Sequence, residues 1–231
     1  MELFAKDNMP RRADLTQQSP PKDRTSPDNQ SSQPLEYPMS INELSDLPAG
    51  LLSIVPDEET AELGAGTTNG KFESELASLD LDAAFQPHLI VDPLMAAACH
   101  SGLWLAHNFL DESHTLSQSI DTPTGSFWHG IMHRREGDFS NAKYWFRRTG
   151  YHPAFESLAT AACVLAKELG TTPQSEFLKT QAEWDPMAFV DLCENAVRGR
   201  DNSAELCARI ARKEWELLMA FCFRQAIGQD S

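Results

Sequence analysis

Apolar residues recur every three to four positions through the second half of the chain, which is the spacing of one face of an α-helix. The first clear stripe holds Met95, Cys99, Leu103, Ala106 and Leu110, and the second holds Leu206, Ile210, Leu217, Leu218, Phe221 and Ile227. No segment alternates apolar and polar residues as a half-buried strand does. The pattern predicts an all-α fold, a compact bundle of about six to seven helices.

Asp-Pro steps and glycines mark where these helices begin and end. A proline suits the first turn of a helix, and a glycine suits the residue after the last turn. Asp138 and Gly150 enclose one helix as its N-cap and its stop. We predict helices over Pro93 to about Leu110, Ser126 to Glu136, Phe139 to about Thr149, Pro153 to Gly170, Thr172 onward, Asp185 to about Gly199, and from Asn202, which pairs with Glu205 as a cap, with a loop over Ser113 to Gly125.

The first 83 residues differ from the rest in composition. They hold six Lys or Arg against sixteen Asp or Glu, with neither Trp nor Cys. Such a stretch buries too little apolar surface to offset the entropy lost on ordering. We therefore predict a disordered acidic, Pro/Ser-rich tail over residues 1–83 and a single all-helical domain over residues 84–231. The apolar stretch from Leu47 to Val55 is a docking motif, an arm across the domain, or part of a structureless linker.

The net charge of −15 argues against nonspecific nucleic-acid binding, because phosphate contacts need a basic surface. The N-terminus lacks the pattern of a signal peptide, and no segment approaches the roughly 18 apolar residues of a membrane span. We expect a cytoplasmic or nuclear protein that binds neither nucleic acid nor membrane. The five cysteines are odd in number and contain no Cys-x-x-Cys pair, which predicts reduced core residues.

The most distinctive phrase of the chain begins at Trp128. It reads Trp-His-Gly-Ile-Met-His-Arg-Arg-Glu-Gly-Asp and continues through Asn141, Lys143 and Tyr-Trp-Phe-Arg-Arg. It resembles the signature of a family of uncharacterised small helical proteins. Gly137 to Phe146 also resembles the second helix of a tetratricopeptide-type repeat, although no second copy follows at a period near 34 residues. The resemblance to the uncharacterised family implies that this region forms one recurring helical unit. It implies no activity.

All seven histidines lie between His88 and His152. His129, His133 and Glu136 stand at i, i+4 and i+7, so they share one face of their helix. The preceding helix carries a matching row if it continues through Ser113. The candidate metal ligands of the two rows are His107, Asp111, His114, His129, His133 and Glu136, with His100 at the start of the first row.

Facing helices that carry imidazoles and carboxylates are how helical bundles bind zinc, iron or manganese. The alternative is a structural polar network in which every buried histidine is hydrogen-bonded. The zinc-protease motif is absent, because Gly130 stands where its glutamate would be.

Basic and aromatic side chains of the same region suit an anion. Guanidinium groups match carboxylate and phosphate, and aromatic faces offer a stacking wall. The candidate ligand-binding residues are Trp128, Arg134, Arg135, Lys143, Tyr144, Arg147 and Arg148. The alternative is a solvated basic face paired to Glu136, Asp138 or the acidic tail, and the tail would then act as an autoinhibitory or solubilising arm.

Two classes of function follow. The favoured one is a helical binding or accessory module that takes an anionic small molecule or a partner protein around residues 107–152 and performs no chemistry. The other is a small metal-dependent hydrolase, lyase or oxygenase that uses the His, Asp and Glu cluster. Metal content distinguishes the two.

Overall fold

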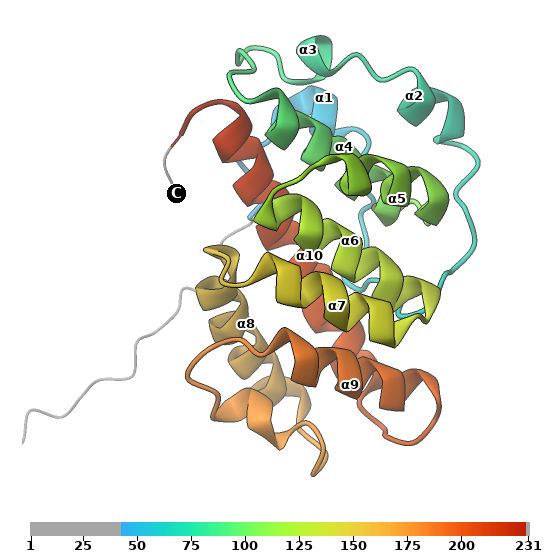
Figure 1. The fold of residues 1–231 in the computed structure, drawn as a ribbon, viewed down its shortest axis with the longest axis vertical. Helices are drawn as coiled ribbons and strands as arrows, with labels where there is room; N and C mark the ends of the chain where they lie inside the picture. The colour runs from blue at the N-terminus through green and yellow to red at the C-terminus, as the bar shows by residue number, and fades with distance from the viewer. Residues whose placement is uncertain (1–42, 230–231) are drawn as a thin grey trace, which may run out of the picture. The chain divides into compact units, whose positions relative to one another are not determined.

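The computed structural model describes residues 43–229, and every regular element among them is a helix (Figure 1). The α-helices are α1 (Ala49–Leu52), α2 (Glu73–Ala77), α3 (Leu81–Ala84), α4 (Pro93–Ala106), α5 (Leu110–Ser119), α6 (Pro123–Glu136), α7 (Phe139–Thr149), α8 (Ala154–Leu169), α9 (Pro186–Val197) and α10 (Ala204–Ala226), and a 3-10 helix spans Glu176–Lys179. The all-α prediction is confirmed for this part of the chain.

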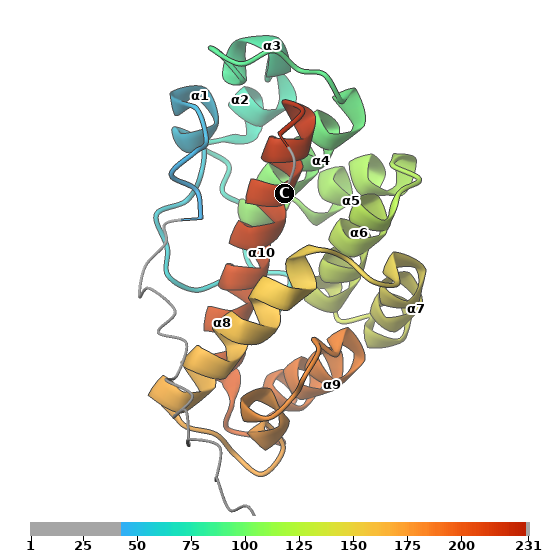
Figure 2. The ribbon, with the colours of Figure 1, turned by 90° about the vertical axis from the view of Figure 1, so that its left-hand side faces the viewer.

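The longest helix, α10, is the one against which much of the fold packs. It contacts α4, α8 and α9, and Figure 1 shows it passing behind α6 and α7. Helices α4 to α7 form a series in which each packs on the next. The short helices α1, α2 and α3 lie together beyond the end of α4 (Figure 2). As a result, α6 contacts helices on several sides, namely α4, α5, α7 and α9.

The core follows α10 and agrees largely with the apolar pattern. Four of the six apolar positions expected for this helix are buried, whereas Phe221 and Ile227 are half-buried. Four of the five cysteines are buried, Cys163 is half-buried, and all five thiols are free. The thiols therefore behave as the small core residues that the sequence predicts.

Side-chain caps set most of the helix boundaries that were predicted correctly. Asp92 accepts hydrogen bonds from the first-turn amides of α4, and Asp185 does the same for α9. Asp138 caps α7, with its Oδ1 accepting from Asn141 N at 3.1 Å. Gly137 ends α6 in the left-handed region, at a φ of 90°. These boundaries are local in sequence, which is why the sequence is sufficient to place them.

The region between α4 and α6 differs from the prediction. Helix α4 ends at Ala106 instead of continuing to Leu110, and Asn108 takes a φ of 65° that a right-handed helix cannot contain. The predicted loop from Ser113 is the helix α5. Serines of α5 form hydrogen bonds with the neighbouring helices. The Ser101 hydroxyl of α4 donates to Ser113 O at 3.0 Å, and the Ser117 hydroxyl bonds to His129 of α6. Packing thus overrides the weak helix propensity of this serine-rich segment.

Three other boundaries also differ. Helix α6 begins three residues early, at Pro123, because Thr122 caps it by accepting from Gly125 N. The segment after Thr172 forms a turn and a short 3-10 helix instead of an α-helix. Helix α10 begins at Ala204, and the predicted cap by Asn202 is replaced by a bond from Ser203 N to Asp201.

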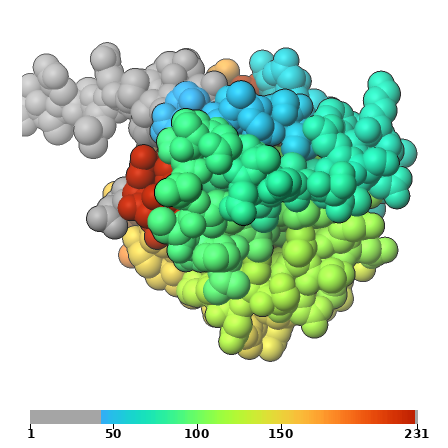
Figure 3. Space-filling model, turned by 90° about the horizontal axis from the view of Figure 1, so that it is seen from above, coloured from blue at the N-terminus to red at the C-terminus, as the bar shows by residue number. Residues whose placement is uncertain are grey.

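Residues 43–83 belong to the folded unit, so the predictions of disorder up to residue 83 and of a domain start at 84 are wrong here. Residues 1–42 of the predicted tail lie outside the described residues. Leu47, Leu51 and Ile54 are buried, so the apolar stretch is part of an arm across the domain. The arm comprises residues 43–83. In Figure 3 this segment, blue to teal, lies against the residues drawn in green.

The arm is held through its backbone as well as its apolar side chains. His107 Nε2 donates to Ile54 O at 2.6 Å, and His100 Nε2 donates to Leu76 O at 2.9 Å. The acidic side chains of residues 57–59 face solvent. A composition averaged over 83 residues conceals this arrangement, because a few well-spaced apolar residues are enough when the rest of the domain supplies the surface that buries them.

Gly102 allows α4 and α6 to approach closely. A Cβ at this position would lie 2.8 Å from the Trp128 ring, and Gly102 O accepts a bond from Trp215 Nε1 at 2.7 Å. Gly102→Ala is expected to lower the free energy of unfolding by about 1–3 kcal/mol, because the rigid indole has little room to move. Urea denaturation measures the change. Gly70→Ala is the control, since nothing lies within 4 Å of its Cβ, and equal stability of both variants would contradict the close packing.

Candidate metal site

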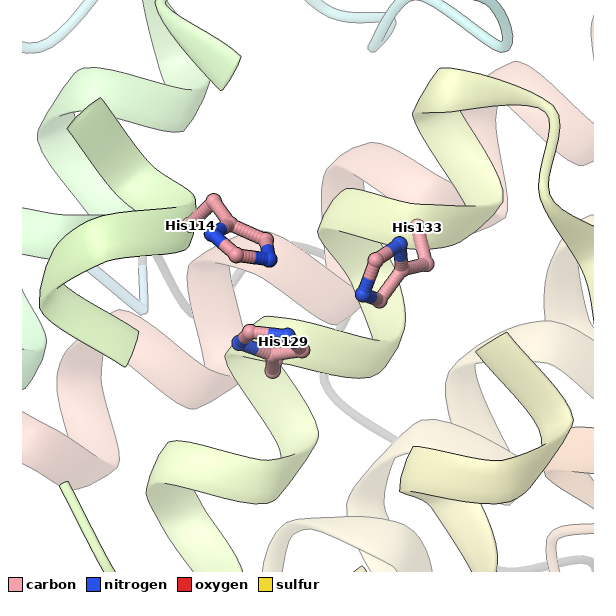
Figure 4. Close-up of side chains that lie close together, drawn as sticks. All are labelled: His114, His129 and His133. Atoms are coloured by element: carbon pink, nitrogen blue, oxygen red, sulfur yellow. The ribbon is translucent and has the colours of Figure 1, made fainter. Parts of the chain in front are cut away.

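Three histidines from two neighbouring helices converge on one point (Figure 4). His114 lies on α5, and His129 and His133 lie one turn apart on α6. One ring nitrogen of each lies within 4.8 Å of the corresponding nitrogens of the other two. His129 and His133 are buried and His114 is half-buried, so the cluster sits beneath the surface with one side near solvent.

The hydrogen bonds around His129 fix which of its nitrogens carries the proton. The Ser117 hydroxyl donates to His114 O at 3.2 Å, so it accepts from His129 Nδ1 at 2.9 Å. Nδ1 then holds the ring proton, and Nε2 has a free lone pair. Metal-ligating histidines use the same arrangement, with one ring nitrogen hydrogen-bonded to an outer residue and the other on the metal.

His133 shows the same arrangement with a carboxylate. Its Nδ1 donates to Glu136 Oε2 at 2.9 Å, which again leaves Nε2 as the basic nitrogen. The Asn141 amide lies 3.0 Å from that Nε2. Because Nε2 carries no proton, the Asn141 side-chain N–H donates to it, and this bond must be released before Nε2 binds a metal ion.

Burial keeps the imidazoles of His129 and His133 neutral. It lowers the pKa of His129 to about 3, with additional repulsion from His133 and His114. Burial also lowers the pKa of His133, although Glu136 opposes this. The Trp145 ring covers His129, with ring centroids 4.0 Å apart. Uncharged imidazoles, in which one ring nitrogen carries no proton, are the form that binds a metal ion.

Three of the six predicted metal ligands are therefore brought together. His107 is not among them, because its Nε2 bonds to Ile54 O and its Nδ1 lies 3.3 Å from Asn69 Nδ2. Asp111 is exposed in the first turn of α5 and lies outside the cluster. Glu136 orients His133 instead of joining the three nitrogens. The predicted row failed because α4 ends before His107 and a separate helix carries Asp111 and His114.

The predicted anion-binding residues do not form one surface. Trp128 is fully buried, and its Nε1 donates to Cys222 Sγ at 3.4 Å, so it offers no stacking wall. Arg134 is buried against Glu214. Arg135 is buried beneath the arm, where its Nε donates to Gly64 O.

The remaining cations lie on α7. Lys143 pairs with Asp191, and Arg148 pairs with Asp121 at 3.3 Å and lies over the Trp145 ring. Tyr144 and Arg147 are exposed. The sequence suggested Glu136 or Asp138 as partners for these cations. The observed partners of Lys143 and Arg148 are instead Asp191 of α9 and Asp121, which precedes α6.

Comparisons of the chain with protein-family models, with curated proteins and with solved structures find no match. Among the described helices, none is both long enough and apolar enough to cross a bilayer. Fold and site together define an all-helical protein with a cluster of three histidines. Its function must be inferred from those side chains and their geometry.

Proposed function

We propose that the protein binds one divalent transition-metal ion, zinc in the first place, through a ring nitrogen from each of His114, His129 and His133. The observation that supports this is the convergence of three ring nitrogens within 4.8 Å of one another. Ligand nitrogens around a tetrahedral zinc ion, at zinc–nitrogen distances of about 2.0–2.1 Å, lie about 3.4 Å apart. Ring movements of about 1 Å would close the cluster on an ion.

Three protein ligands leave one position of a tetrahedral ion open, which is the arrangement of catalytic zinc sites. An ion there would carry a water molecule and lower its pKa to about 7. Asn141 lies at the edge of this position and suits a hydrogen bond to that water or to a substrate oxygen. The open coordination position and the neighbouring Asn141 favour a metal-dependent hydrolase or lyase over a binding module that performs no chemistry.

The proposal is tested by the metal content of the full chain, purified without a histidine tag or chelator. We expect about one zinc, iron or manganese ion per chain by plasma mass spectrometry. His133→Ala is expected to abolish binding, because two imidazoles hold such ions weakly. His88→Ala is the matched control, since it removes an imidazole outside the cluster. Equal metal content in the His133→Ala protein and the wild type would overturn the proposal.

A second variant separates metal binding from simple loss of a ligand. Ser117→Ala keeps all three imidazoles and removes only the hydroxyl that orients His129. Outer partners of metal-bound histidines typically contribute about 10–100-fold in affinity. We expect a loss of that size in zinc titrations followed by calorimetry.

A further inference from the structure

A cavity of about 100 Å³ lies between the arm and the helices α4, α6 and α10, where none of the three clustered histidines reaches. The arm closes it with the segment from Pro56 to Glu62. Leu105, Ile131 and Trp215 form its apolar wall. A space of this size exceeds that of a single water molecule and is smaller than the pockets that hold drug-sized ligands, so it suits a small molecule of a few atoms.

A buried cation without a carboxylate partner borders this cavity. Arg135 is 5% exposed, yet its hydrogen bonds go to neutral acceptors: Nε donates to Gly64 O at 2.7 Å, and Nη2 donates to Asn108 Oδ1 at 2.5 Å. A buried guanidinium is costly unless an anion offsets its charge.

The other two arginines of the cavity are already paired. Arg134 is bound to Glu214 on one side of the cavity. Arg212 pairs with Glu216 at 2.8 Å and lies over the Trp215 ring. Arg135 is therefore the one of the three arginines whose charge is left for a ligand.

We propose that this cavity binds a small carboxylate or phosphate whose oxygens pair with Arg135 and whose apolar part lies against Ile131 and Trp215. The hydrogen bonds described for Arg135 use its Nε and Nη2, which leaves the N–H groups of Nη1 to pair with an oxyanion. The proposal goes beyond the metal site, because the two sites use different faces of α6 and different chemistry.

The arm segment would act as the cover of this site. Two contacts hold it to α10: Ala61 N donates to Ala208 O at 3.0 Å, and Glu59 pairs with Arg209 at 3.6 Å. The ion pair is solvent-exposed on the Glu59 side and contributes little. Glu62 faces solvent at the rim, so its charge opposes an incoming anion until the cover moves.

The test uses the full chain treated with chelator, so that a metal cannot bind the probes. Butyrate and inorganic phosphate are titrated separately by calorimetry at constant ionic strength, with chloride as the balancing salt. Saturable binding of either probe is expected, and the probe that binds identifies the oxyanion. Arg135→Gln should weaken binding at least tenfold, whereas Arg148→Gln, which changes an exposed cation on α7, should not.

Failure of both probes to bind the wild type, or equal binding by Arg135→Gln and the wild type, would overturn the proposal. If Arg135→Gln does not fold, Glu62→Gln decides the question, because it removes only a rim carboxylate. Binding that is about two- to fivefold tighter supports the site, and unchanged affinity overturns it. His133→Ala should bind the anion as the wild type does, which separates this site from the metal proposal.

Discussion

Glu214→Gln is expected to lower the free energy of unfolding by about 3–5 kcal/mol, since it leaves Arg134 as an unpaired buried cation. Both residues are 1% exposed. Arg134 Nη1 donates to Glu214 Oε1 at 3.2 Å, and Nη2 donates to the other carboxylate oxygen. Burial lowers the pKa of Arg134 and Glu214 raises it, with a net increase. Without Glu214 the effect of burial remains, but the pKa of a guanidinium is high enough that Arg134 stays charged at pH 7.

Urea denaturation at pH 7 measures this change. Glu216→Gln on the same helix is the matched control, because its carboxylate pairs with Arg212 and Lys213 nearer the surface, where we expect a loss of about 1 kcal/mol or less. The double variant Arg134→Met with Glu214→Leu should recover most of the stability, since no charge is then buried. Similar losses for the two glutamates would show that the buried pair does not stabilise the fold as described.

Acidification of the metal-free protein from pH 7 to pH 4 is expected to cost about 3 kcal/mol through His152 alone. Burial lowers the pKa of His152 from 6.5 to about 4. Between these values the unfolded chain takes up a proton that the folded chain does not. The stability is therefore fully present above pH 6.5 and is lost as the pH falls toward 4. His129, whose pKa is also lowered, acts in the same direction.

The structure explains why His152 stays neutral. Ala154 N donates to its Nδ1 at 3.2 Å, so that nitrogen cannot carry a proton, and Nε2 lies 3.2 Å from the Thr124 hydroxyl. Phe127 and Phe221 cover the ring. A second proton would break the backbone bond and place a charge among aromatic rings.

Unfolding free energies at a series of pH values test this expectation. His152→Gln should be less stable than the wild type at pH 7 but should lose about 1.4 kcal/mol less per pH unit between pH 6 and pH 4.5. His88→Gln serves as the control for removal of an imidazole elsewhere. An identical pH dependence in the wild type and His152→Gln would disprove the role assigned to this histidine.

The sequence was sufficient where the cause of a structure is local. Asp138 caps the start of α7 and Gly150 follows its last residue. Asp185 caps the start of α9 in the same way. The pairing of His129 with His133 follows from their spacing on one helix. Each of these features depends on residues at most a few positions apart.

Distant partners decided the rest. His114 joins the cluster and His107 does not, and the difference arises at Asn108, whose positive φ starts a new helix direction. Ser117 completes the site by holding His129, but as one serine in a polar segment it carries no distinguishing signal. Arg134 resembles its neighbours in the sequence, yet its partner, Glu214, is 80 residues away.

Helix α6 is buried along nearly all of its length, from Thr124 to Arg135. One side holds two of the clustered histidines, another holds the Arg134 ion pair, and a third borders the cavity. Substitutions throughout this helix will consequently be poorly tolerated, but the reason will differ from one side of the helix to another. A mutational scan that scores only growth or abundance would mark the whole helix as essential, so residues that serve function can be separated from those that serve folding only by measuring metal content, anion binding and stability on the same variants.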